Sequence, residues 1–499
     1  MPVGACPVDP VDGPASMAGG RSAPGRVPKG SNRSAAIVLL NFARAVRTMA
    51  SCVPDGWGEC RRLRAFRRPR GAGPPWSAPK RISSVKHERR VVVTGLSAIT
   101  PLGVGLAPTW EGLLAGRNGI ARLTHFDPSQ HRSQMAGEVR DFQVEDWIDG
   151  KSARRMDRVM HFGLAASTMA MADAALDHAG FDRNRAGVII GSGIGGSASI
   201  EEGCAVCTEK GPRSMGPFFV SKVLINMTAC AVSIEHGLKG PLTALSVACS
   251  TGANAVGDAF RVIQRGDADI MVAGASEACL TPVAYGGFCA TRSMSTRNDD
   301  PEHASRPFDK NRDGFVMGEG AGLAVLEELE HARQRGARIY AELAGYGNTA
   351  DAYHITAPEP EGDGMIRVMR AALNDAGLAP EGIGYINAHG TSTVLNDRTE
   401  SLAIQRVFGE HAQNLKISAT KSMIGHLMAA AGAAEFVATV MSLHTGKIHP
   451  TINYEEPDPE CPLDYVPNVA REFQFDAAMC NAFGFGGGNA CLIVRRFGD

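Results

Sequence analysis

The 499-residue sequence has no long hydrophobic segment. A helix that spans a bilayer needs about 18 to 20 predominantly apolar residues. The nearest candidate, residues 35–43 (AAIVLLNFA), is much shorter and is followed by Arg44 and Arg47. A secretory signal would place such a run nearer the start, before a cleavage site of small residues. The sequence therefore predicts a soluble protein that does not bind a membrane.

Net charge is also almost absent, because 51 Lys and Arg are balanced by 52 Asp and Glu. The balance hides an asymmetry. Residues 1–87 contain 15 Lys and Arg against four Asp and Glu, a net +11, which leaves −12 for the rest of a chain whose total is −1. An acidic body is a poor candidate for binding nucleic acid, whose phosphates attract basic surfaces.

The twelve cysteines lack the spacing of a structural metal site. Cys204 and Cys207 form a CxxC pair with no second pair and no His at ligand spacing, whereas structural zinc needs four ligands. We therefore expect no metal. Unpaired, scattered cysteines suit a reducing compartment. This favours the cytoplasm if the protein is bacterial.

Residues 1–87 are rich in Pro, Gly and Arg, a composition that buries little apolar surface and predicts disorder. Three interpretations of this leader are open: a transit peptide for a plastid or mitochondrion, a basic tail or linker, or upstream sequence included by a wrong start. No Met occurs between Met49 and Met135, and Val85 could be a non-ATG start. We favour the third interpretation slightly over the first.

From Arg89 onward, continuous apolar runs alternate with helix-like segments, as in VVVTG and AGVIIGSG. This pattern predicts an α/β protein with mainly parallel sheets covered on both faces. Two segments echo each other. AALDHAG (174–180) precedes GVIIGSG, and AALNDAG (371–377) precedes GYINAHG, an offset of 197 residues. The echo indicates two duplicated halves.

Cys249 lies between an apolar strand, LTALSVA, and a predicted helix, STGANAVGDAFRVIQ. Its sulfur is therefore expected at a helix N-terminus, where the macrodipole and free backbone N–H groups favour a thiolate. An inert buried cysteine is the alternative, and describes most cysteines. Position alone leaves both open.

Two histidines lie in loops of small residues. His389 is in NAHGTST after a strand, and His426 is in KSMIGHLMAAAGAAE before an Ala-rich helix. A single loop histidine is usually structural, but two such loops beside a candidate nucleophile favour a site. Imidazoles can hydrogen-bond a thioester oxygen or transfer protons near neutral pH.

The segment NAFGFGGGNA (481–490) contains four glycines, which permit positive φ and close backbone approach. A tight bend before the last strand is the simpler interpretation. A dinucleotide-binding loop is disfavoured, because no strand–loop–helix unit follows.

In this order, ACSTGANA, NAHGTST, KSMIGH and NAFGFGGGN resemble the β-ketoacyl-[acyl-carrier-protein] synthases, in particular the elongating type II enzymes. The resemblance runs from about Arg89 to the C-terminus and includes residues 305–322 and 351–356. It implies a thiolase-like α-β-α-β-α fold, with one half over residues 88–340 and the other over 341–499. It also implies an acyltransferase that condenses an acyl thioester with a decarboxylated malonyl thioester in fatty acid elongation. The expected partners are an acyl carrier protein and a second copy of the chain. No cofactor is expected beyond the carrier's phosphopantetheine.

The resemblance also assigns roles to residues. Cys249 is the implied nucleophile, and His389 and His426 would stabilise the enolate left when CO₂ departs. The other implied residues are Lys421 and Glu435 as catalytic support, the backbone N–H groups of Cys249 and Phe485 as the oxyanion hole, Ile194, Phe288 and Phe485 as acyl pocket and gate, and Thr391 and Thr393 as pantetheine contacts. Two residues depart from the family pattern: Gly488 and Ile424 both stand where Thr is usual, which could alter substrate preference.

Other functions remain possible. A thiolase or hydroxymethylglutaryl-CoA synthase shares a related fold but does not pair two histidines in such loops. A specialised polyketide or organellar ketosynthase shares every motif. A chain-length factor would lack the nucleophile. A cysteine hydrolase would need neither the second histidine nor the glycine loop, and a binding module would need none of the three residues.

Overall fold

A computed structural model describes residues 89–176 and 180–498. The leader predicted over residues 1–87 lies outside the described residues, and so does part of the first repeat segment, residues 177–179. The first described strand, β1 (Val91–Thr100), is buried along its whole length. Within the described ranges, no helix has both the length and the apolar character needed to cross a membrane.

The described strands form one eleven-stranded sheet and two small two-stranded sheets. From edge to edge, the large sheet runs β11 (Lys416–Ser418), β10 (Tyr385–Asn387), β14 (Ala477–Phe483), β15 (Gly488–Arg495), β9 (Ala341–Ala350), β1, β8 (Gly320–Glu328), β7 (Ile270–Glu277), β5 (Ala186–Gly191) and β6 (Leu242–Thr243), with β2 (Gly103–Val104) paired to β1. Strands β1 and β9 pair over only three residues each, so the sheet narrows at its centre.

Each half of the sheet has the same design. Passing inward from either edge, the first two strand pairs are parallel and the next two antiparallel. The duplicated α/β halves are therefore confirmed. The prediction of mainly parallel sheets is wrong, since the inner strands of both halves are antiparallel. Buried strands are apolar whatever the direction of their neighbours, so the sequence pattern indicated burial and not direction.

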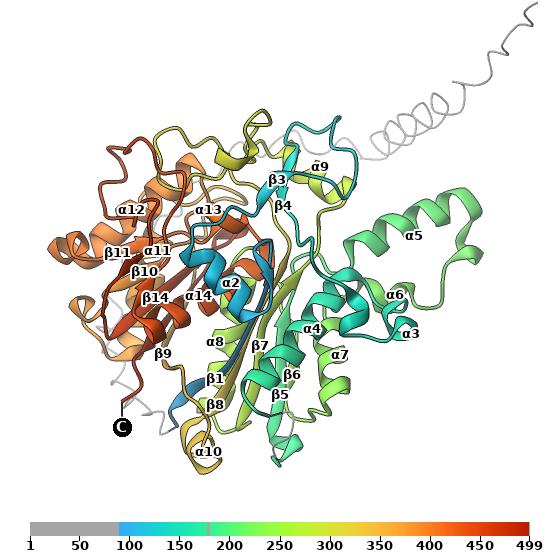
Figure 1. The fold of residues 1–499 in the computed structure, drawn as a ribbon, viewed down its shortest axis with the longest axis horizontal. Coiled ribbons are helices and arrows are strands. Elements are labelled where there is room, and N and C mark those ends of the chain that lie inside the picture. The colour runs from blue at the N-terminus through green and yellow to red at the C-terminus, as the bar shows by residue number, and fades with distance from the viewer. Residues whose placement is uncertain (1–88, 177–179, 499) are drawn as a thin grey trace, which may run out of the picture. The chain divides into compact units, whose positions relative to one another are not determined.

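The helices form three layers around the two halves (Figure 1). Helices α8 (Thr251–Gln264) and α14 (Ala431–Thr445) contact strands of both halves and form the middle layer. The N-terminal half is covered outside by α4 (Arg158–Asp173) and α7 (Met227–His236), and the C-terminal half by α11 (Asp363–Ala376) and α12 (Val394–Phe408). The α-β-α-β-α arrangement is confirmed.

The two middle helices approach each other closely at their N-terminal turns. Every residue from 431 to 440 is buried, as a helix between the two halves of the sheet requires. A Cβ at Gly252 would lie 2.6 Å from the backbone nitrogen of Ala433, and one at Gly432 would lie 3.0 Å from that of Ala253. Small residues thus let the two backbones meet. The segments that precede both helices, which carry Cys249 and His426, are brought together.

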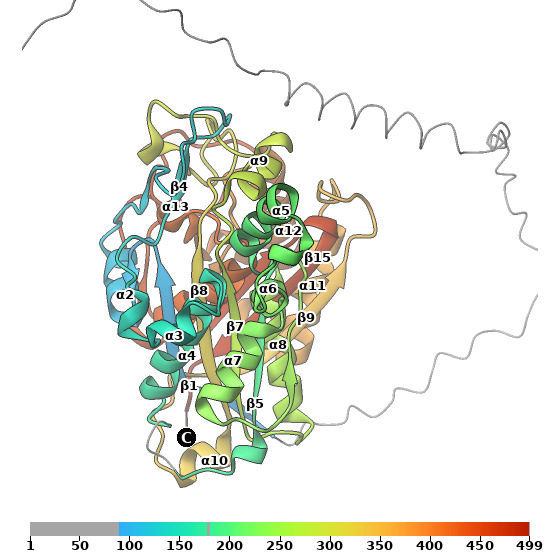
Figure 2. The same ribbon diagram turned by 90° about the vertical axis from the view of Figure 1, so that its right-hand side faces the viewer.

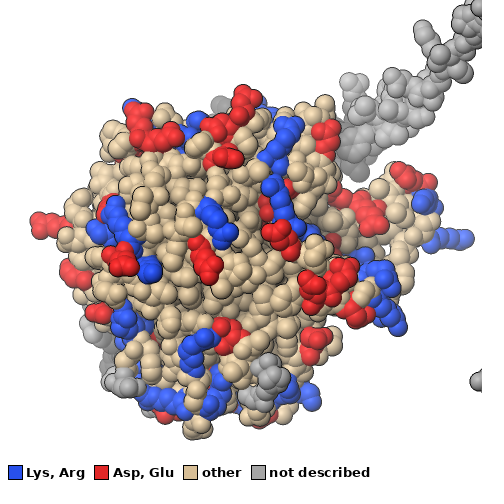
Figure 3. Space-filling model, viewed as in Figure 1, with Lys and Arg blue, Asp and Glu red and all other residues tan. Residues whose placement is uncertain are grey.

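The remaining elements surround this core. They are α2 (Leu106–Leu114), α3 (Gly150–Ala153), α5 (Ser197–Lys210), α6 (Phe219–Val223), α9 (Pro282–Ala290), α10 (Leu329–Gln334) and α13 (Lys421–Ile424), with hairpin-like pairs β3 (Ile120–Arg122)–β4 (Met135–Gly137) and β12 (Lys447–Ile448)–β13 (Arg471–Glu472). Helix α5 extends outward beyond β5 and β6 (Figure 1). On the face drawn in Figure 3, basic and acidic side chains are intermixed.

Candidate active site

Cys249 is positioned by a strained turn at the start of α8. The preceding residue, Ala248, has φ 46°, a left-handed conformation that is unfavourable for a residue with a Cβ. The Thr251 hydroxyl braces the turn: it accepts the N–H of Val247 and donates to the carbonyl of Ala248, both at 2.7 Å. The sulfur therefore lies at the helix N-terminus, as the sequence predicted.

The same placement buries the thiol, which is only 6% exposed. Burial raises the pKa of Cys249 to about 11, although a backbone hydrogen bond from Phe485 and the positive charge of Lys421 oppose this change. Burial thus outweighs the helix N-terminus that was expected to favour a thiolate. The side chain of Cys249 is therefore a thiol near neutral pH.

His389 and His426 face each other, with ring centroids 5.5 Å apart and planes at 86°. Burial and the charge of Lys421 lower the pKa of both histidines well below the usual value, so both rings are neutral at pH 7. The Nδ1 of His426 accepts the backbone N–H of Met428 at 3.1 Å. The Nδ1 of His389 accepts from the Lys421 ammonium at 3.3 Å.

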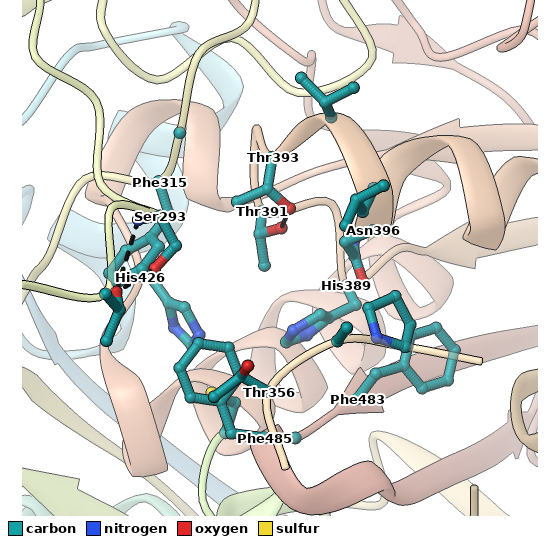
Figure 4. Close-up of a pocket in the computed structure, with 18 of the residues that line it drawn as sticks. Ser293, Phe315, Thr356, His389, Thr391, Thr393, Asn396, His426, Phe483 and Phe485 are labelled. Carbon is teal, nitrogen blue, oxygen red and sulfur yellow. Dashed lines mark hydrogen bonds between the residues drawn. The ribbon is translucent and has the colours of Figure 1, made fainter. Parts of the chain in front are cut away.

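Because each Nδ1 accepts a hydrogen bond, each ring proton belongs on Nε2. The Nε2 of His426 is buried and has no hydrogen-bond partner in the described part of the chain. In Figure 4 both rings point into the pocket, beside Phe485 and below Thr391 and Thr393. The pair can therefore donate two N–H groups to one oxygen that gains negative charge.

A buried ion pair supports His389. Lys421 and Glu435 side chains are each 1% exposed and directly hydrogen-bonded. The ammonium also donates to the His389 carbonyl at 2.6 Å. Breaking a buried pair typically costs about 3 to 5 kcal/mol, because the remaining charge stays uncompensated. The pair therefore fixes both the backbone and the tautomer of His389.

Two further carboxylates, missed in the sequence, hold the His389 loop. Glu400 accepts the backbone N–H groups of His389 and Gly390, both at 2.9 Å. Asp397 accepts that of Thr391 at 3.0 Å. Both lie on α12 directly after NAHGTST, and their three-residue spacing on one helix face was the available signal. Burial raises the pKa of Glu400 to about 7.

One pocket of about 380 Å³ joins most of the predicted residues. Its lining includes Cys249, His389, His426, Phe288, Phe485, Thr391 and Thr393. The two threonine hydroxyls hydrogen-bond each other at 2.9 Å (Figure 4). Phe315 and Phe483, which the sequence did not single out, also line it and contact the rings of His426 and His389 edge-on.

Ile194 does not line this pocket. Its side chain packs, together with Phe288, against an apolar cluster that includes Cys289, Met294 and Phe315.

Cys204 and Cys207, the CxxC pair, are both exposed on α5. Across the described ranges, no group of three or more His, Cys, Asp or Glu is arranged to hold a metal ion.

The backbone angles and close contacts of the glycine loop account for its glycines, including the one that departs from the family pattern. Gly486 and Gly487 have φ of 82° and 74°, where a Cβ would cause strain. Gly488 instead has ordinary backbone angles, but a Cβ there would lie 2.6 Å from Cγ1 of Val247. Val247 occupies that space. The other departure, Ile424, is buried in an apolar cluster with Leu102 and Trp110, outside the pocket lining.

Comparison with known proteins is consistent with this geometry. The chain matches the family model described as beta-ketoacyl synthase, N-terminal domain, over residues 88–332, and the one described as beta-ketoacyl synthase, C-terminal domain, over residues 340–455. The chain belongs to the β-ketoacyl synthase family. Residues 1–87 lie outside both matches.

Several β-ketoacyl synthases align over nearly their whole length. The 3-oxoacyl-[acyl-carrier-protein] synthase 2 of Synechocystis sp. is 51% identical over 411 residues, 82% of this chain and 99% of that protein. The enzyme of the same name from Staphylococcus aureus is 49% identical over 413 residues, 83% of this chain and all of that protein. A solved type II polyketide ketosynthase, in complex with its acyl-carrier protein, shares 38% identity at a TM-score of 0.77, covering 82% of this chain and 100% of that one.

Proposed function

We propose that this chain is a 3-oxoacyl-[acyl-carrier-protein] synthase of the elongating type. It condenses a carrier-bound acyl thioester with malonyl-acyl carrier protein to give 3-oxoacyl-acyl carrier protein and CO₂ in fatty acid elongation. One observation carries the proposal: a buried thiol at a helix N-terminus shares a pocket with two neutral imidazoles whose Nε2 protons face inward.

In the first half-reaction, the Cys249 sulfur attacks the acyl thioester carbonyl. Backbone N–H groups of Cys249 and Phe485 stabilise the tetrahedral oxyanion. The C–S bond to the carrier then breaks, and the thiol proton of Cys249 ends on the departing carrier thiol. Neither histidine accepts this proton in the tautomer that its hydrogen bonds imply, because each Nε2 already carries one.

In the second half-reaction, the malonyl thioester oxygen accepts hydrogen bonds from His389 and His426. The bond to the carboxylate breaks, CO₂ leaves, and its electron pair forms an enolate whose oxygen the two Nε2–H groups stabilise. The enolate carbon attacks the Cys249 thioester. As the new C–C bond forms, the C–S bond to Cys249 breaks, the thiolate takes a proton from water, and 3-oxoacyl-carrier departs.

Other residues position the substrates. Lys421 and Glu435 hold His389, and Thr391 and Thr393 offer paired hydroxyls to the amide groups of the pantetheine arm. The acyl chain extends past Phe485, which gates the pocket, toward Phe288 and Ile194. That Ile194 borders the far end of the acyl chain stays a prediction.

The partners are an acyl carrier protein and a second copy of the chain. A solved relative was determined with its carrier protein bound. For the dimer, β6 is an edge strand whose Leu242 is 41% exposed, and Phe218, Val220 and Leu224 of the neighbouring segment are also exposed. An edge strand with exposed apolar neighbours is suited to an isologous contact with another copy.

A polyketide or organellar ketosynthase with the same chemistry is the second candidate. A polyketide enzyme is among the structural relatives at 38% identity, but the 3-oxoacyl-[acyl-carrier-protein] synthases named above are closer in sequence. Identity therefore favours fatty acid elongation.

The test is transfer of a radiolabelled acyl group from acyl carrier protein, followed by addition of malonyl-acyl carrier protein. We expect label on Cys249, then labelled 3-oxoacyl-carrier. Release of free labelled acid without a condensed product would indicate a hydrolase and contradict the proposal.

A further inference from the structure

Helix α9 carries Phe288 to the pocket but has little intrinsic stability. Its sequence, PVAYGGFCA, places Gly286 and Gly287 in the middle of a nine-residue helix, where glycine is a poor helix former. Its N-cap, Thr281, makes no side-chain capping bond within the described residues. The position of α9, and with it Phe288, therefore depends on contacts with other elements.

Glu201, one turn into α5, supplies the missing cap. Its Oε1 accepts three hydrogen bonds: from the Thr281 hydroxyl at 2.5 Å, and from the backbone N–H groups of Val283 at 3.0 Å and Ala284 at 3.2 Å. A carboxylate at a helix N-terminus also interacts favourably with the helix dipole. Figures 1 and 2 both show α5 and α9 as neighbours.

The start of α5 is itself anchored. The Ser197 hydroxyl donates to the carbonyl of Ala278 at 3.0 Å, and Asp157 accepts both the N–H and the hydroxyl of Ser199, at 2.9 and 2.7 Å. Glu201 therefore projects from a fixed support. Through its carboxylate, Glu201 fixes the start of α9 relative to the start of α5.

The other end of α9 reaches the catalytic groups through aromatic rings. Phe288 packs edge-on against Phe315 at 6.2 Å between centroids, and Phe315 packs edge-on against His426 at 5.5 Å. A shift of α9 would move the Phe288 side of the pocket while Cys249, at the start of α8, stays in place.

We propose that Glu201 is a positioning residue for acyl-chain selectivity: by capping α9 across the gap from α5, it holds Phe288 as a fixed wall of the pocket. The inference rests on the proposed condensing function. Without the cap, the first turn of α9 loosens and Phe288 is free to move. The enzyme then discriminates less between short and long acyl chains.

The test compares Glu201→Ala, Glu201→Gln and the matched control Glu202→Ala, an exposed neighbour on the same helix. The kcat/KM for acylation of Cys249 is measured with short, medium and long acyl-carrier substrates. We expect Glu201→Ala to change the long-to-short ratio by about tenfold, the scale of a lost cap. Glu201→Gln, which keeps an acceptor oxygen, should restore most of the ratio, and Glu202→Ala should leave it unchanged.

An unchanged ratio in a folded Glu201→Ala protein would overturn the inference, and so would an equal loss at every chain length. If Glu201→Ala does not fold, Thr281→Val removes one of the three donors and should move the ratio in the same direction, by a smaller factor. An unchanged long-to-short ratio in Thr281→Val would also reject the inference. Absence of acylation in the wild-type protein would instead reject the proposed function.

Discussion

Both pocket histidines direct a protonated Nε2 into the pocket, but a different donor fixes the tautomer of each ring. A lysine ammonium holds Nδ1 of His389, whereas a backbone N–H holds Nδ1 of His426. Both arrangements leave the proton on Nε2. In the proposed reaction the rings therefore donate to the developing oxyanion, whereas the attacking group is Cys249, a separate buried thiol whose pKa is raised to about 11 by burial.

This separation predicts a division of labour. Cys249→Ala should abolish condensation but keep malonyl decarboxylation, because both donors remain. His389→Ala or His426→Ala should slow decarboxylation by roughly 100- to 1,000-fold, the usual effect of removing one oxyanion donor. Acylation of Cys249 should persist at least in part. Separate assays of CO₂ release and acyl transfer check this, and normal condensation by Cys249→Ala would refute it.

The raised pKa of Glu400 predicts that the stability of the folded protein depends on pH. Burial raises its pKa from 4.5 to about 7 in the folded protein. Between these values the folded state retains a proton that the unfolded state has lost, so this group's contribution to stability falls as pH rises from about 4.5 to about 7. The change is up to about 3 kcal/mol.

Glu400→Gln, a neutral residue of similar shape, removes this titration. In thermal unfolding, the Tm of the variant should rise relative to that of wild type as pH increases through this window. The variant also loses part of the hydrogen bonding to the N–H groups of His389 and Gly390, and this loss applies at every pH. A constant difference in Tm between pH 5 and 7 would mean that Glu400 does not titrate as described.

At the scale of elements, the contact between α8 and α14 brings Cys249 and His426 together. Cys249 precedes one helix and His426 precedes the other, and small residues let the helices meet backbone to backbone. Neither helix alone forms a site. The distance between their N-terminal turns therefore sets how far Cys249 lies from His426.

Two glycine variants test this contact at graded severity. Gly252→Ala would place its Cβ 2.6 Å from a backbone nitrogen, closer than atoms tolerate, whereas the Cβ of Gly432→Ala would meet its nearest atom at 3.0 Å. Overpacking typically costs about 1 to 3 kcal/mol. We expect Gly252→Ala to lose more stability in thermal unfolding and more condensing activity than Gly432→Ala. Equal, small effects would show that the helices separate easily.

At the scale of the whole molecule, everything assigned to the reaction lies within residues 89–498. The family matches begin at residue 88, and β1 forms the centre of the sheet by pairing with β8 and β9. The described body is therefore organised around its own first strand, without any assigned role for residues 1–87.

A chain that starts near Val85 should consequently fold and condense as well as the full-length protein. Expression of both versions, with soluble yield, Tm and condensation rate measured in parallel, checks this. A large loss of soluble protein on truncation would mean that residues 1–87 stabilise the body. The mass of the mature N-terminus from the native source separates the transit-peptide and wrong-start interpretations.

The sequence by itself determined the α/β class, the duplicated halves and the segments that carry Cys249, His389 and His426. The placement of Cys249 is local, because a tight turn followed by the helix α8 puts it at a helix N-terminus, although the strand predicted before it over residues 242–248 is only two residues long, Leu242–Thr243. Four motifs in a fixed order were then enough to indicate the family.

The tertiary structure alone decided the antiparallel inner strands, the thiol state of Cys249, the Nε2 tautomers, and the contact of the Glu201 carboxylate with the start of α9. Each depends on groups brought together by folding. Lys421 is 32 residues from the His389 it contacts, and Glu201 is 80 or more from the donors it caps. Burial and hydrogen-bond partners of this kind leave no periodic trace in a sequence, because they arise between elements and not within them.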